Sequence, residues 1–180
     1  MATLSQLVRR GAIALLALLV ATAFAAAPPS AADVKAVFLY NFTGFVEWPA
    51  ETLPSPDTPF VIGVCADYEM VQLVREAVRG ERVRGHPIEV APVSSSTQLA
   101  RCQLVYVAAG REWILDRSPP RHALLTVGET DEFLRCGGII RFVPDRNRIK
   151  LQISLPAARS AALVVSSQLL RIAETLGADQ

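Results

Sequence analysis

Six polar side chains that could bind a small molecule follow three apolar runs of the sequence. The runs, FVIGVC (60–65), QLVYVAA (103–109) and ALLTVG (123–128), have the length and composition of buried strands. The residues after them are Asp67, Tyr68, Arg111, Glu129, Thr130 and Asp131. Ligands of parallel α/β sheets collect at the carboxyl ends of strands, which predicts a polar ligand mouth. The interpretation that we favour makes Asp67 and either Thr130 or Asp131 helix N-caps and leaves the others solvated.

Catalytic chemistry has little support in this sequence. Of the two histidines, His86 lies in a Gly-His-Pro turn and His122 follows Pro-Pro-Arg. The chain has no G-x-S-x-G, G-x-G-x-x-G, P-loop or H-E-x-x-H motif. A hydrolase would need a pair such as Cys102 or Cys136 with His122, and the histidines and cysteines show no metal-binding spacing. We therefore predict a protein that is not an enzyme and that uses no metal or cofactor.

The three cysteines, Cys65, Cys102 and Cys136, could form one disulfide in an oxidising compartment. Cys65 ends one predicted strand and Cys102 precedes another, so parallel neighbours in simple register would hold them about 10–17 Å apart. A disulfide needs Cα atoms within about 7 Å. Pairing of Cys65 with Cys136 is at least as compatible with the pattern, because both are predicted near strand carboxyl ends. Three reduced cysteines are the further alternative, and the pairing stays open.

The aromatic segment YNFTGFVEWP (40–49) could be a binding site, a membrane-seeking patch or ordinary core. Asp33 is expected to cap a helix with the apolar positions Val34, Val37, Phe38, Phe42, Phe45 and Val46 at helical spacing. Three phenylalanines then share one face, which predicts core packing, and Trp48 is expected to plug the helix end at Pro49. The positions expected on the other side, toward solvent or an interface, are Tyr40, Thr43 and Glu47.

Residues 1–27 have the features of a secretory signal peptide. Arg9 and Arg10 precede an apolar run, and the tract ATAFAAAP allows cleavage near Ala25–Ala27. The run is shorter than the roughly 20 residues of a spanning helix, so an uncleaved anchor is less favoured. Without these two arginines the 18 basic residues become 16 against 17 acidic, a net charge of −1 that gives no footprint for nucleic acid. We predict one periplasmic domain over residues 28–180.

Further elements alternate along this domain. Asp67 is expected to begin a helix, and TDEFLR (130–135) to form a shorter one. GHPIEVAPV (85–93) suits an edge strand, because two prolines interrupt it.

Residues 137–155 predict an antiparallel hairpin around the loop PDRNR (144–148). Residues 157–176 predict a C-terminal helix broken near Val165, with Ser166 capping its second part. The predicted fold class is α/β, a layered sandwich with a mainly parallel central sheet, a C-terminal antiparallel hairpin and a C-terminal helix.

Six segments between residues 34 and 173 resemble, in order, the signature segments of the YfiR-like periplasmic proteins. They are VKAVFLYNFTGFVEWP, FVIGVCADYE, VRGHPIEV, CQLVYVA, LLTVGETDEFLRCGGIIRFV and IKLQISLPAARSAALVVSSQLLRIA. The resemblance implies a non-enzymatic regulator that restrains the periplasmic sensor region of an inner-membrane diguanylate cyclase and so lowers cyclic di-GMP. It also implies release by an OmpA-like outer-membrane lipoprotein, and a homodimer with disulfides. Three cysteines cannot form two disulfides, so the chain departs from a two-disulfide arrangement.

Two hypotheses of different classes therefore remain. The leading one is a regulator of a membrane signalling enzyme, most directly a diguanylate cyclase. The other is a small-molecule sensor or solute-binding module, serving a sensor kinase or hybrid receptor through the predicted mouth.

Overall fold

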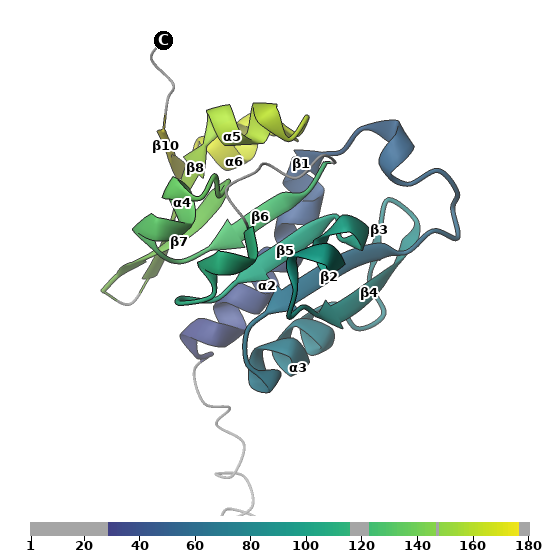
Figure 1. Cartoon of the computed structure of the whole chain (residues 1–180), viewed down its shortest axis with the longest axis horizontal. Coiled ribbons are helices and arrows are strands. Elements are labelled where there is room, and N and C mark those ends of the chain that lie inside the picture. The colour runs from purple at the N-terminus through teal and green to yellow at the C-terminus, as the bar shows by residue number, and fades with distance from the viewer. Residues whose placement is uncertain (1–28, 116–122, 147, 177–180) are drawn as a thin grey trace, which may run out of the picture.

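An eight-stranded sheet organises the part of the chain that the computed structural model describes, residues 29–115, 123–146 and 148–176. Its strands are β2 (Phe60–Cys65), β3 (Arg82–Val83), β4 (His86–Pro92), β5 (Leu104–Val107), β6 (Leu125–Gly128), β7 (Ile140–Asp145), β8 (Arg148–Ser154) and β10 (Ala173–Leu176). They lie in the order β10-β8-β7-β6-β5-β2-β4-β3 (Figure 1). The five strands from β4 to β7 pair in parallel, and β7 pairs antiparallel with β8. The predicted fold class is therefore confirmed.

Helices and short 3₁₀ turns cover both faces of this sheet, and a separate two-stranded sheet joins β1 (Val46–Glu47) to β9 (Val164–Val165). The helical segments are α2 (Ala31–Phe45), η1 (Ala50–Thr52), α3 (Tyr68–Ala77), η2 (Ser96–Arg101), η3 (Glu112–Leu115), α4 (Asp131–Arg135), α5 (Leu155–Ser160) and α6 (Ser167–Leu170). α2 and α3 pack in the larger core on one face, and η2, η3 and α4 pack in a second core on the other. Burial on both faces explains why β2, β5 and β6 are continuous apolar runs.

Helix α2 begins earlier than predicted, because Ser30 and not Asp33 is its N-cap. The Ser30 hydroxyl accepts from the Asp33 amide at 3.2 Å, and the Asp33 carboxylate accepts from the Ser30 amide at 2.8 Å. These two bonds form a capping box, and the hydrogen bonds from Ser30 lower the pKa of Asp33. The helix ends at Phe45, before the predicted stop at Pro49, because the next two residues pair with β9.

The aromatic face of α2 is core, as predicted, although two positions on the helix were assigned wrongly. Phe42 is fully buried and stacks on Phe142 of β7 with 5.9 Å between ring centroids. Val37 is half exposed, whereas Thr43 is buried, and its hydroxyl is satisfied there because it donates to the Tyr40 carbonyl at 2.7 Å. Trp48 is buried as predicted. Its ring meets Phe60 edge to face, and its Nε1 donates to the Gln103 carbonyl at 3.1 Å.

The predicted C-terminal helix is wrong in its last part. Ser166 caps the second helical segment as predicted, because its hydroxyl accepts from the Gln168 amide at 3.1 Å. After α6 the chain forms β10, which pairs in parallel with β8 from Ala173↔Leu151 to Leu176↔Ser154. The outer edge of β8 provides backbone hydrogen-bond partners for residues 173–176. This pairing with β8 outweighs the local preference of these residues for a helix.

The hairpin and the edge strand were predicted in outline. β7 and β8 pair antiparallel as far as Asp145↔Arg148, so the strands extend into the loop predicted over 144–148. β4 is nearly an edge strand, because only the two-residue β3 lies outside it. The predicted signal peptide and His122 lie outside the described residues. Each helix among the described residues is too short or too polar to span a lipid bilayer.

Two glycines make room for the one aromatic ring that anchors helix α4. Phe133 is fully buried, and a Cβ atom added at Gly128 or at Gly138 would collide with its ring. The amide of Gly138 also donates to the Phe133 carbonyl at 3.0 Å. The short helix is thus held against the ends of β6 and β7 by one side chain in a slot with no spare space.

Replacement of Gly138 by Ala is expected to reduce the free energy of unfolding by about 1–3 kcal/mol, because the buried Phe133 ring cannot yield. The matched control is Gly44→Ala, at an exposed site near the end of α2 where an added Cβ meets nothing within 4 Å. That change should raise the free energy by about 0.5–1 kcal/mol. Urea titration of both variants measures the change in the free energy of unfolding. Equal changes would contradict the claim that Phe133 needs a glycine at position 138.

Candidate functional site

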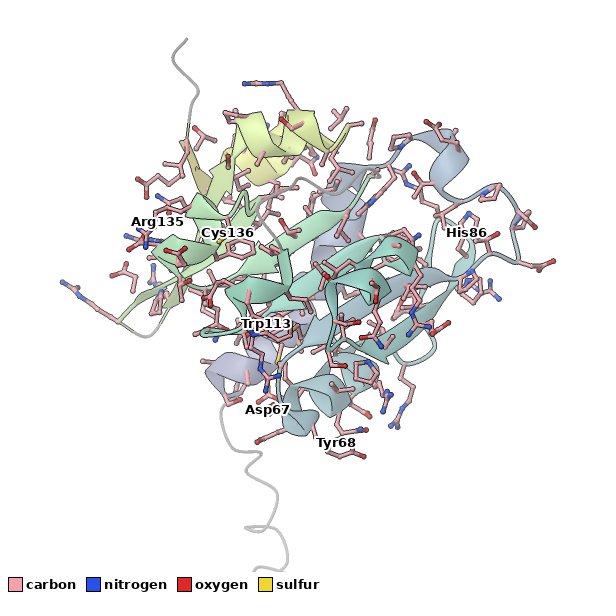
Figure 2. All side chains as sticks on the ribbon, in the orientation of Figure 1. Asp67, Tyr68, His86, Trp113, Arg135 and Cys136 are labelled. Atoms are coloured by element: carbon pink, nitrogen blue, oxygen red, sulfur yellow. The ribbon has the colours of Figure 1, made fainter. Side chains whose placement is uncertain are left out.

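The predicted mouth lies where parallel strands end together. Register pairs Cys65 of β2 with Val107 of β5, and Tyr106 of β5 with Val127 of β6. The loops that follow these strands therefore leave the sheet at the same edge. Four of the six predicted residues belong to these loops, and Tyr68 and Asp131 begin the helices that follow two of them. Figure 2 labels Asp67, Tyr68 and the exposed Trp113.

At the centre of this edge, Glu129 accepts two hydrogen bonds on one carboxylate oxygen. Lys35 of α2 approaches that oxygen with its Nζ at 2.7 Å, and the side chains of this ion pair are 19% and 22% exposed. The hydroxyl of the buried Tyr106 donates to the same oxygen. Burial raises the pKa of Tyr106, and the Glu129 carboxylate raises it further by hydrogen bond and charge. The phenol therefore stays protonated and acts as a donor, while the carboxylate ties α2 to β5 and β6.

Two of the predicted mouth residues are helix caps, as the favoured interpretation expected. Asp67 accepts from the Met70 amide at 2.9 Å and begins α3. The Thr130 hydroxyl accepts from the Phe133 amide at 3.1 Å and begins α4. A side-chain oxygen in this position satisfies an amide that the first helical turn leaves without a partner. These atoms are thus committed to secondary structure.

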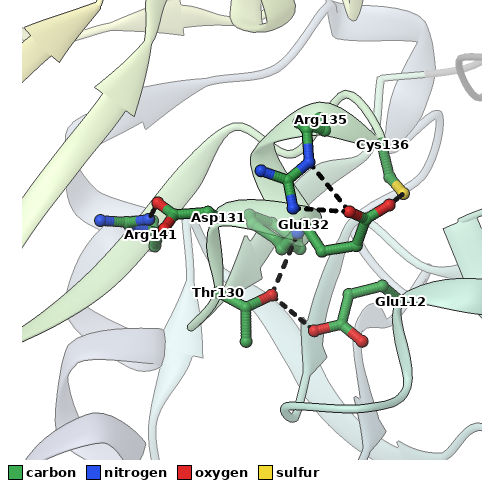
Figure 3. A network of polar contacts seen from close by, with 8 residues as sticks. Glu112, Thr130, Asp131, Glu132, Arg135, Cys136 and Arg141 are labelled. Atoms are coloured by element: carbon green, nitrogen blue, oxygen red, sulfur yellow. Dashed lines mark hydrogen bonds and ion pairs between the residues drawn. The ribbon is translucent and has the colours of Figure 1, made fainter.

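The remaining acids around α4 form a polar network within the fold (Figure 3). The Thr130 hydroxyl donates to Glu112 of η3 at 2.6 Å, and Asp131 forms an ion pair with Arg141 of β7. Burial acts to raise the pKa of Glu112, but the hydrogen bond from Thr130 and backbone hydrogen bonds outweigh it, so the pKa is lowered. Glu112 is therefore ionised at neutral pH and helps to hold η3 against α4.

Arg111 lies over the end of β2, where its guanidinium interacts with Cys65. Burial raises the pKa of the Cys65 thiol, and the charge and hydrogen bond of Arg111 offset part of this rise. A fully buried thiol with a raised pKa is a poor nucleophile. Of the six predicted residues, Tyr68 is the one with a mostly exposed side chain and no polar contact among those described. Whether a small ligand binds at this edge stays a prediction.

No disulfide joins the three cysteines in the structure. Cys65 pairs in register with Val107, whereas the Cys102 sulfur lies beside Gly63, 2.9 Å from where a Cβ there would be. Burial raises the pKa of Cys102 to about 11. Cys136 is half-buried at the end of α4, and its thiol donates to Glu132 at 3.6 Å. The predicted disulfide thus stays a prediction without support from this geometry.

Of the two histidines considered for catalysis, the structure describes His86. The Nδ1 atom of the half-buried His86 lies 2.9 Å from the Thr58 carbonyl, at the amino end of β4. The hypothetical partner His122 falls outside the residues described. Among residues 29–115, 123–146 and 148–176, no group of His, Cys, Asp or Glu could hold a metal ion.

Sequence reasoning missed Trp113, whose side chain is 60% exposed. It lies in η3 between the half-buried Glu112 and the buried Ile114. The available signal was a tryptophan in the polar segment REWILDR, two residues after a predicted site residue.

A double-mutant cycle with Lys35→Met and Glu129→Gln tests the central ion pair. We expect a coupling of about 1 kcal/mol in the free energy of unfolding, because both side chains are mostly buried and the Glu129 oxygen that binds Lys35 also accepts from Tyr106. The control cycle is Arg79→Met with Glu76→Gln, an ion pair between the last turn of α3 and the turn after it, whose side chains are 76% and 63% exposed. Its coupling should stay below about 0.5 kcal/mol. Equal couplings in the two cycles would show that the central pair has no special role.

Comparison with known proteins gives a family and a distant structural likeness. Residues 32–174 match the family described as YfiR/HmsC-like (DUF4154). No curated protein matches the chain. Among solved structures, the crystal structure of a conserved domain protein from Vibrio cholerae O1 biovar eltor str. N16961 is similar, with 12% identity and a TM-score of 0.46. The match covers 81% of this chain and 60% of that chain, so it spans less than two thirds of the other protein.

Proposed function

The chain belongs to the YfiR/HmsC-like family, and on that premise we propose that it is a periplasmic regulatory protein. In this proposal it binds the sensor region of an inner-membrane signalling enzyme, most directly a diguanylate cyclase, and lowers cyclic di-GMP. The observation that carries the proposal is the family match over residues 32–174, which includes every strand of the sheet except the end of β10. The predicted export signal in residues 1–27 supports the same compartment.

The arrangement of the strand-end residues agrees with a binding role better than with catalysis. Glu129, Asp67 and Thr130 are committed to an ion pair and two helix caps. The thiol of Cys65 is buried beneath Arg111. A general base or nucleophile must reach a substrate in a suitable protonation state, and these groups are held in contacts that stabilise the fold.

A periplasmic protein can restrain a cytoplasmic cyclase domain only through the part of the enzyme that it contacts. It must bind the inactive conformation of the sensor region more tightly than the active one, because equal affinity shifts no population. Each tenfold difference in affinity shifts the equilibrium by about 1.4 kcal/mol. The proposal includes a homodimer, and release when an OmpA-like outer-membrane lipoprotein sequesters the regulator.

Deletion of the gene is expected to raise cellular cyclic di-GMP, and restoration of the full chain should reverse the rise. The readout is the nucleotide concentration in matched cultures. A version without residues 1–27 is the control, since without the predicted signal peptide it should stay in the cytoplasm and fail to complement. An unchanged nucleotide level in the deletion strain would contradict the proposed function.

A further inference from the structure

Two exposed aromatic side chains stand out on the surface of the described residues. The large hydrophobic side chains that are exposed there are Val37, Tyr68, Trp113, Val164 and Ile172. Tyr68 is 76% exposed and Trp113 is 60% exposed, and they are the aromatic members of this set. Tyrosine and tryptophan are enriched among the residues that dominate binding energy at protein interfaces.

The sheet places these two aromatic residues at the same edge. Tyr68 is the first residue of α3, directly after β2, and Trp113 is in η3, which follows β5. β2 and β5 are parallel neighbours whose ends meet at Cys65↔Val107. Because Arg111 interacts with the Cys65 thiol, the loop that carries Trp113 reaches across the end of β2. Figure 2 shows Trp113, Asp67 and Tyr68 in the same region of the molecule.

The backbone beneath both aromatic residues is fixed by contacts already described. Asp67 caps the helix that begins at Tyr68, and Ile114 and Leu115 bury the end of η3 in the second core. Glu112, the residue before Trp113, is bonded to Thr130. A backbone that is already ordered loses less conformational entropy on binding, so such a surface can bind without a rearrangement of the backbone.

Arg111 brings a positive charge to the end of β2, but the charges directly beside Tyr68 are negative. Asp67 and Glu69 flank it, both are exposed, and within the described chain neither takes part in an ion pair. An aromatic face also attracts a Lys or Arg side chain through the negative potential of its π-system. A segment with basic and apolar residues together is therefore the complementary partner in charge and in surface character.

We propose that Tyr68, Trp113, Asp67 and Glu69 form a docking surface for a basic segment of the sensor region that this protein restrains. We name these four residues the aromatic–acidic surface. Lys or Arg side chains of the segment would lie against the aromatic rings and beside the two carboxylates, while its apolar side chains cover Trp113. This assignment rests on the proposed function and specifies the part of the chain that contacts the partner.

The test measures binding of the mature chain to one defined probe. The probe is the purified periplasmic region of the diguanylate cyclase whose own deletion abolishes the rise in cyclic di-GMP. Trp113→Ala should raise the Kd at least about tenfold, as expected for an aromatic residue at the centre of an interface. Glu69→Lys should weaken binding and reduce its dependence on salt, because a carboxylate that attracts the basic segment becomes a like charge.

Ile172→Ala is the matched control, because Ile172 is 68% exposed and lies between α6 and β10, away from the aromatic–acidic surface. Its Kd should match that of the unchanged chain. Both aromatic and control variants replace exposed side chains, so their thermal unfolding should stay close to that of the parent. This check separates loss of contact from loss of fold.

Distinct outcomes separate the two proposals. No rise in cyclic di-GMP on deletion overturns the proposed function itself. If deletion raises cyclic di-GMP but Trp113→Ala leaves the Kd for the probe unchanged, only the assignment of the aromatic–acidic surface is overturned. If Trp113→Ala dissociates a dimer of this chain and leaves binding of the probe intact, the occupant is a second copy, and the assignment to the sensor region is wrong.

Discussion

Helix α2 packs its aromatic face across the sheet, and this contact positions most of the larger core. Phe38 and Phe42 stack with 5.9 Å between ring centroids, and Phe142 of β7 lies at about the same distance from both. Both ends of the helix are tied down. Lys35 joins its first turns to Glu129, and the Ser166 amide donates to the Phe45 carbonyl at 2.8 Å just before β1 pairs with β9. One helix therefore connects the middle of the sheet with the C-terminal segments.

The contacts that hold α2 in place also use polar groups that would otherwise be available to bind a ligand. Glu129 and Tyr106 lie where an α/β enzyme would place ligand-binding residues, yet they hold α2 in place. Thr130 and Glu112 similarly join α4 to η3. Most of the polar side chains at the strand ends thus stabilise the fold. The side chains exposed at this edge are aromatic and acidic. That combination agrees with the binding role proposed above.

The parts of the fold that could be predicted are those with a local signal. β2 has the predicted bounds, residues 60–65, because a fully buried parallel strand reads as an apolar run. Asp67 and Ser166 were identified as caps because each precedes a helical pattern and carries a short polar side chain. The C-terminal helix failed as a prediction because β10 exists through pairing with β8, which is a tertiary contact that four residues cannot encode alone.

The candidate site was predicted in location more successfully than in chemistry. The rule that loops after parallel strands meet at one edge placed Asp67, Glu129 and Thr130 together. It could not reveal that Lys35, which is distant in sequence, forms an ion pair with Glu129. It also missed Trp113, because exposure of a tryptophan depends on how η3 packs and not on spacing. Burial and long-range pairing are the two physical quantities that sequence periodicity leaves undetermined.

Hydrogen–deuterium exchange of residues 28–180, alone and with the periplasmic region of the proposed partner cyclase, tests the account most directly. Slower exchange of backbone amides in residues 67–72 and 111–115 upon binding is the predicted result, because the partner would cover the start of α3 and η3. Protection confined to other segments, such as α5, α6 and β10, would place the interface elsewhere and contradict the central claim.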